Sequence, residues 1–198
     1  MMQFEREERQ FVYTWLSNLL GKELSESQLV QYQQGAFDDF FAFLSEQGFQ
    51  SQVAVIQQEL QRLKTLDFAH LELAADYTQL FLLDGAVSAL PYASVYLPEA
   101  DLESHFAFLE ALLVRFQLQI NRDKPEPSDH LCVYLELLAQ LAEAEDWATY
   151  QHFIQDYFLP WLLMFNDKVQ RVKISTALYQ QVIVLLILLL QAEMKSSL

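Results

Sequence analysis

Apolar side chains recur at intervals of three and four residues along most of this chain, and this spacing constrains the fold more than any other feature. In residues 4–20, an apolar face that includes Phe11 and Trp15 lies opposite charged side chains, and Gly21 ends the segment. Apolar and polar residues do not alternate over any stretch long enough for a confident strand, and four glycines are too few for many tight turns. The sequence therefore predicts an all-α fold.

The same periodicity predicts a bundle of about ten helices. They are expected near residues 4–20, 25–32, 36–47, 51–63, 67–82, 100–119, 127–142, 146–158, 159–169 and 173–192. Ser25 with Gln28 resembles a capping box, and Asp67 is a candidate N-cap. The apolar run 182–190 is well short of the ~20 residues that a membrane span needs, so we expect a buried core helix there.

Two prolines interrupt the helical pattern near the middle of the chain. Pro125 and Pro127 each disfavour helix in the residue before them, so residues 121–127 are predicted to be a hinge. The hinge would join an N-terminal lobe, residues 1–120, to a C-terminal lobe, residues 128–198. Such a joint invites exchange of a lobe between protomers, which predicts a monomer in equilibrium with domain-swapped homodimers.

The formal net charge of −15 limits the classes of partner. An acidic surface repels phosphate backbones and anionic lipid, so we expect no nucleic-acid binding and no stable membrane insertion, whereas basic peptides are favoured. The single cysteine, Cys132, excludes an internal disulfide and a cysteine-rich zinc site, and favours a reducing compartment. The N-terminus lacks the layout of an export signal, so a cytoplasmic location is expected.

The run EPSDH, residues 126–130, has two interpretations. As a helix start, Glu126 would be the N-cap, Pro127 the first helical residue, and Asp129 an acid in the first turn. This interpretation does not explain His130, because a cation is disfavoured near a helix N-terminus. The other interpretation is a binding site.

Catalysis by this run is poorly supported, because neighbouring helical residues such as Asp129 and His130 point about 100° apart. The histidines show no paired spacing for a metal, and no glycine-rich loop for phosphate is present. We therefore expect no enzymatic activity, no metal and no cofactor.

A second candidate site is the helix end and long loop between residues 77 and 96. Aromatic rings with polar tips, held by prolines, can form a groove for an apolar or basic peptide. They can equally pin the loop to the core. The residues concerned are Tyr77, Leu80, Phe81, Pro91, Tyr92, Ser94 and Tyr96.

Together, the runs DYTQLFLL, PYASVYL and EPSDHLCVYLELLAQL resemble the TorD/DmsD family of cytoplasmic chaperones for molybdoenzymes exported by the twin-arginine route. The resemblance extends along essentially the whole chain and is strongest to the branch that serves trimethylamine N-oxide reductase. It implies a chaperone that binds an apo-molybdoenzyme and its twin-arginine signal peptide, and that assists insertion of the molybdopterin cofactor before export. It also implies weak GTP binding.

The resemblance assigns the peptide and apo-enzyme site to the seven loop residues named above together with four residues of the EPSDH run. These four are Glu126, Pro127, Asp129 and His130. Acidic groups such as Asp129 can pair with guanidinium groups in bidentate fashion. Two other classes of function stay open from the residues alone: a helical adaptor that joins two partners through its acidic face, and a small hydrolase that uses Asp129 and His130.

Overall fold

The computed structural model describes residues 4–118 and 128–196, which form two compact units. Unit 1 comprises Phe4, Lys22–Leu90 and the chain from Asn166 onward, and unit 2 comprises Glu5–Gly21 and Pro91–Phe165. Neither unit is one of the contiguous lobes expected from the sequence, because the first helix packs with the middle of the chain and the last helix packs with its first half. The expected hinge, residues 121–127, lies outside the described residues.

Unit 1 is built from helices alone within the described residues. Its elements are α2 (Glu26–Gln33), α3 (Asp38–Leu44), the π-helical turn η1 (Ser45–Phe49), α4 (Gln50–Leu63), α5 (Ala69–Phe81) and α10 (Leu178–Ser196). The chain kinks at Gly48, whose φ of 101° suits glycine, so that α4 can turn back from α3. α4 packs against α10.

Helix α10 is, among the described residues, the one helix long and apolar enough to cross a membrane. More than half of its apolar window, 56%, is nevertheless buried within the protein. Leu185, Leu186 and Leu189 are fully buried, and even Glu193 is 2% exposed. This burial is typical of a core helix, as the apolar run 182–190 predicts.

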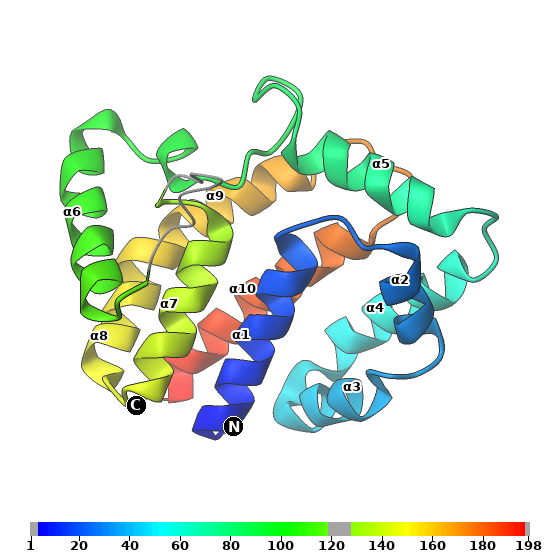
Figure 1. Ribbon diagram of the computed structural model, residues 1–198, viewed down its shortest axis with the longest axis horizontal. Helices are drawn as coiled ribbons and strands as arrows, with labels where there is room; N and C mark the ends of the chain where they lie inside the picture. Colours follow the sequence, from blue (N-terminus) through cyan, green and yellow to red (C-terminus); the bar gives the residue numbers. More distant parts are fainter. Residues whose placement is uncertain (1–3, 119–127, 197–198) are drawn as a thin grey trace. The chain divides into compact units, whose positions relative to one another are not determined.

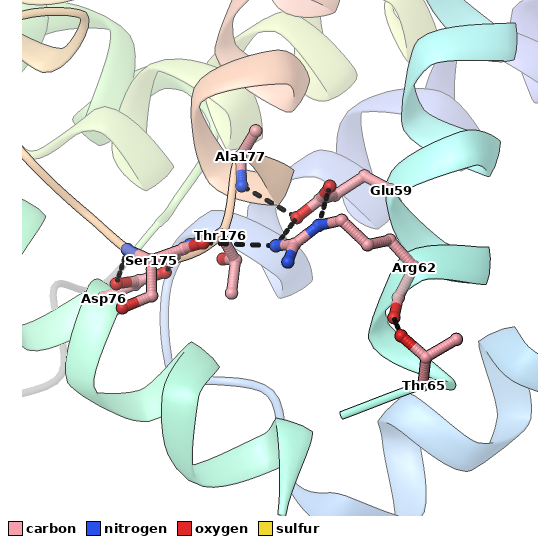
Figure 2. Close-up of polar contacts among 7 residues, drawn as sticks. All are labelled: Glu59, Arg62, Thr65, Asp76, Ser175, Thr176 and Ala177. Atoms are coloured by element: carbon pink, nitrogen blue, oxygen red, sulfur yellow. Dashed lines mark hydrogen bonds and ion pairs between the residues drawn. The ribbon is translucent and has the colours of Figure 1, made fainter. Parts of the chain in front are cut away.

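Two carboxylates fix the start of α10 (Figure 2). Asp76, on α5, accepts the backbone N–H groups of Ser175 at 2.8 Å and Thr176 at 2.6 Å through separate oxygens. Glu59, on α4, accepts the N–H of Ala177 at 2.9 Å. These amides belong to the segment that leads directly into α10, so the two acids supply the acceptors that this segment needs and tie the start of α10 to α4 and α5.

The guanidinium of Arg62 accompanies Glu59 in this cluster. Its Nη2 donates to Oε1 at 2.6 Å and its Nε to Oε2 at 2.8 Å, which makes the pair bidentate. The hydrogen bonds from Arg62 are the largest cause of the lowered pKa of Glu59, and the amide of Ala177 acts in the same direction against burial. Glu59 is therefore an ionised acid within the core of unit 1.

The regular elements in the described part of unit 2 are also helices. Its elements are α1 (Arg6–Leu20), the 3₁₀ turn η2 (Ala93–Val95), α6 (Glu99–Arg115), α7 (Leu131–Glu143), α8 (Trp147–His152), the π-helical turn η3 (Phe153–Phe158) and most of α9 (Leu159–Val169). α1 and α7 run side by side (Figure 1). The hydroxyls of Tyr13 and Tyr150 meet at 2.5 Å in the interior. The predicted all-α class is confirmed.

Two predicted helix caps and one predicted helix face can be compared with the structure. The capping box is present, with Ser25 and Gln28 in reciprocal hydrogen bonds. Asp67 is not the N-cap of α5, because Phe68 takes that position in a left-handed conformation without a side-chain cap. Phe11 is 52% exposed, since α1 buries a face centred on Trp15 and Leu16.

Candidate functional site

Helix α7 begins at Leu131, and His130 is its N-cap. The imidazole Nδ1 of His130 accepts the backbone N–H of Cys132 at 3.2 Å, as an oxygen of serine or aspartate does at other helix starts. Nδ1 is therefore the unprotonated nitrogen of this ring. The prediction that Asp129 lies in the first turn of this helix is wrong, because Asp129 precedes the cap and its side chain bonds elsewhere. Glu126 and Pro127 lie outside the described residues.

A short β-bridge ties the start of α7 to the long loop. Tyr92 and His130 form an isolated antiparallel bridge, and their rings meet edge to face at 5.1 Å. The N–H of Leu131 donates to the carbonyl of Pro91 at 2.9 Å, and the N–H of Ala93 donates to the carbonyl of Asp129 at 3.0 Å. The structure thus brings together residues of two motifs that stand well apart in the sequence.

The carboxylate of Asp129 lies at the centre of this junction and is 1% exposed. Its Oδ2 accepts the backbone N–H of Ser94 at 2.8 Å. Its Oδ1 is buried and has no hydrogen-bond partner among the described residues. A buried carboxylate oxygen without a donor is costly, and most such oxygens in folded proteins are paired. Oδ1 is therefore an acceptor to which the described residues supply no donor.

A buried pair on α6 and α7 interacts electrostatically with the same carboxylate. His105 Nε2 and the hydroxyl of Tyr134 are 2.5 Å apart, and both residues are buried. Burial lowers the pKa of His105, and the nearby charge of Asp129 acts against that shift. Burial raises the pKa of Tyr134, and Asp129 adds to the increase. The pair is therefore neutral near neutral pH.

Sequence reasoning did not assign a role to either member of this pair. His105 has no second histidine at helical spacing, and Tyr134 looks like an ordinary core residue of its helix. The signal that was available is a histidine whose neighbours at i−3, i+3 and i+4, namely Leu102, Phe108 and Leu109, are apolar. Its partner comes from another helix, 29 residues later in the chain.

Tyr96, the last of the predicted loop residues, packs in the aromatic interior of unit 2. Its ring lies 6.3 Å from that of Trp161 in a stacked arrangement and 5.9 Å from that of Phe165, edge to face. Burial raises the pKa of its hydroxyl. Ser94 is exposed, and Tyr92 and Tyr96 are partly exposed. The loop therefore presents Ser94 to solvent while its tyrosines hold it against α7 and α9.

Tyr77, Leu80 and Phe81 belong to unit 1 and are buried in it, at 5%, 0% and 3% exposure. The rings of Tyr77 and Phe81 meet that of Tyr179, on α10, at 5.4 and 6.1 Å. These contacts give the three residues a structural role in fixing the end of α5. That they also contact a peptide stays a prediction.

Comparisons with known proteins place the chain among relatives of one kind. The profile of the nitrate reductase delta subunit family matches residues 44–167. A protein named chaperone protein TorD from Pasteurella multocida is 79% identical over 98% of both chains. Another from Histophilus somni is 50% identical and covers 96% of this chain and 98% of its own.

Among solved structures, a redox enzyme maturation protein described as putative, from Archaeoglobus fulgidus, covers 99% of this chain. Its TM-score is 0.47 and its sequence identity is 20%, so the structural similarity is weak.

Proposed function

Because the chain belongs to the nitrate reductase delta subunit family, with relatives named chaperone protein TorD, we propose that it is a chaperone for the maturation of a molybdoenzyme. It binds the apo-enzyme, trimethylamine N-oxide reductase in this proposal, together with the twin-arginine signal peptide of that enzyme. Binding keeps the apo-enzyme open for insertion of the molybdopterin cofactor and delays export until insertion is complete. The chaperone acts in the cytoplasm and catalyses no reaction.

The observation that carries this proposal is the unpaired Oδ1 of Asp129. An arginine side chain supplies a planar fork of N–H donors, always charged, which matches a carboxylate better than a lysine ammonium does. Because Oδ1 is buried, the loop Pro91–Ser94 would have to shift for this oxygen to take one of these donors, and the same loop would carry the peptide backbone past α7. The acidity of the whole chain attracts such a basic leader from solution.

Isothermal titration calorimetry with the isolated leader peptide tests this function. The native peptide is expected to bind, and replacing its arginine pair by two lysines should weaken binding by about tenfold or more, because the compact lysine ammonium is more strongly hydrated than a guanidinium and costs more to bury beside Oδ1. Equal affinity for both peptides would contradict the proposal. If the mature apo-enzyme bound while neither peptide did, the adaptor with an acidic face would be the better account.

The oligomeric part of the proposal is a monomer in equilibrium with a domain-swapped homodimer. Light scattering over a range of protein concentrations should show two species whose ratio changes with dilution. A single species at every concentration would contradict it.

A further inference from the structure

Unit 1 contains a cavity of about 340 Å³ between α2 and the connection from α4 to α5. Buried Leu29, Leu63 and Ala69 form its apolar floor. Glu26 and Lys64 stand at its rim and are exposed. Gln33 and His70 also line it, so the recess combines an apolar floor with polar walls and suits a ligand that has both apolar and polar groups.

Phe68, at the mouth of this cavity, breaks two local rules. It is the N-cap of α5 but carries no side-chain oxygen to accept an amide, and its φ of 57° is a left-handed conformation that is rare for an aromatic residue. Its ring is also 71% exposed, so burial does not compensate for the strain. Such a combination is expected where function rather than stability selects the residue.

Further apolar side chains lie near Phe68. Val30, on α2, also lines the cavity and is 38% exposed, and Leu71, one turn into α5, is 57% exposed. Exposed apolar residues are ordinary when scattered, whereas a group around a recess is typical of an interaction site. We call the cavity with Val30, Phe68 and Leu71 the α2–α5 groove.

The charges around the α2–α5 groove define the partner. Glu26 at the rim and the exposed Asp67 and Glu72 beside Phe68 outnumber the one lysine, Lys64. Among the described residues, the carboxylate of Glu26 and the ammonium of Lys64 form no ion pair. An apolar segment with a basic residue beside it therefore complements this surface better than an acidic one.

We propose that the α2–α5 groove binds a short amphipathic segment of the mature client enzyme, with a large apolar side chain against Phe68 and a lysine or arginine beside Glu26. This inference rests on the proposed chaperone function and adds a client contact that lies wholly in unit 1, whereas Asp129 lies in unit 2. A second copy of this chain fits poorly as the occupant of this groove, because its 12 lysines and arginines against 27 acidic residues offer few basic segments for the acidic rim.

The variant Phe68→Asn separates binding from folding. Asparagine tolerates the left-handed conformation and is a preferred N-cap, so the Tm should be unchanged or higher. The affinity for apo-trimethylamine N-oxide reductase lacking its leader should fall about tenfold or more, because a central aromatic anchor is lost. Glu26→Gln should weaken the same binding about twofold to fivefold, more at low salt.

Val55→Gln is the matched control, because Val55 is 41% exposed on α4 and does not line the cavity. It should leave the affinity for the leaderless apo-enzyme unchanged. Binding of the leader peptide should be unchanged in both the Phe68 and Val55 variants. Asp129→Asn should show the reverse pattern, with the peptide lost and the leaderless enzyme retained.

Several results would overturn the inference. A lower Tm for Phe68→Asn would make the ring structural, unchanged affinity would leave it without a role, and a shift from dimer to monomer would make the occupant a second copy. If the wild-type chain bound the full-length apo-enzyme but not the leaderless one, the α2–α5 groove would fail while the proposed function stood. If it bound neither protein nor peptide, the proposed function itself would fail.

Discussion

Asp76 in unit 1 and Asp129 in unit 2 are both aspartates that the fold buries, at 3% and 1% exposure. Each accepts backbone N–H groups from a segment distant in the sequence. Asp76 uses both oxygens, for Ser175 and Thr176, whereas Asp129 uses one, for Ser94, and its Oδ1 has no partner in the part of the chain that the structure describes.

A buried carboxylate with both oxygens paired stabilises the fold, because it supplies acceptors to backbone amides that would otherwise be buried without one. A buried carboxylate with only one oxygen paired contributes less to stability, and its second oxygen still lacks a hydrogen-bond donor. The comparison therefore separates a structural acid from a binding acid by their hydrogen bonds alone. Burial does not separate them.

The largest effect is expected for Asp76→Ala. The N–H of Thr176 would be left buried without an acceptor, and the start of α10 would lose its charge partner, so the free energy of unfolding should fall by about 3 kcal/mol. Urea unfolding measures this. Asp67→Ala is the control and should cost under about 0.5 kcal/mol, since Asp67 caps no helix. Equal losses of unfolding free energy for the two variants would mean that Asp76 has no special structural role.

Glu59→Gln tests whether the second acid at the start of α10 acts through its charge. We expect a cost of about 1.5 kcal/mol at neutral pH from the weakened bonds to Arg62 and Ala177. The folded pKa of Glu59 is lowered, so its stabilisation is present above the ordinary value of 4.5 and is lost as pH falls through the folded pKa. The difference from wild type should therefore shrink in acid. A difference that does not change with pH would contradict an ionised Glu59.

Two substitutions separate the capping role of His130 from its proposed contact with the ligand. His130→Ala should cost about 1 kcal/mol, because the N–H of Cys132 loses its acceptor, whereas His130→Asn should retain the cap. Thermal unfolding of both variants measures the cap, and calorimetry with the leader peptide measures the imidazole. If the two variants are equally destabilised, His130 is not capping α7 in solution.

The smallest effect concerns His105, whose imidazole pKa NMR can follow. Its folded pKa is below the ordinary value of 6.5 because it is buried, so the stability it contributes is lost as pH falls through that lowered value. Asp129→Asn should lower the pKa further, since it removes the charge that opposes the shift. Asp101→Asn should have a smaller effect, because Asp101 is exposed and screened. An unchanged pKa in Asp129→Asn would mean that Asp129 carries no charge near His105.

The sequence predicts an interaction correctly when its two partners lie close together in the chain. The capping box of Ser25 and Gln28 is confirmed because both partners lie within one turn. The start of α7 is predicted wrongly because Asp129 bonds to Ser94, 35 residues earlier, rather than to its own helix.

Long-range partners explain the residues that sequence reasoning missed. Asp76 has its partners 99 and 100 residues later in the chain, and the spacing of the sequence contains no sign of them. Phe68 was missed for another reason, since a neighbouring aspartate offered the better cap by propensity and the structure did not use it. Residues that break local preferences are therefore best found in the structure.

The most direct test replaces each aspartate by its amide and compares leader-peptide affinity with the free energy of unfolding. Asp129→Asn is expected to weaken peptide binding by about tenfold or more while changing the unfolding free energy by under about 1 kcal/mol. Asp76→Asn should instead lower the unfolding free energy and leave the peptide affinity unchanged. If Asp129→Asn binds the peptide as tightly as wild type, or unfolds as readily as Asp76→Asn, the unpaired oxygen is not a binding group.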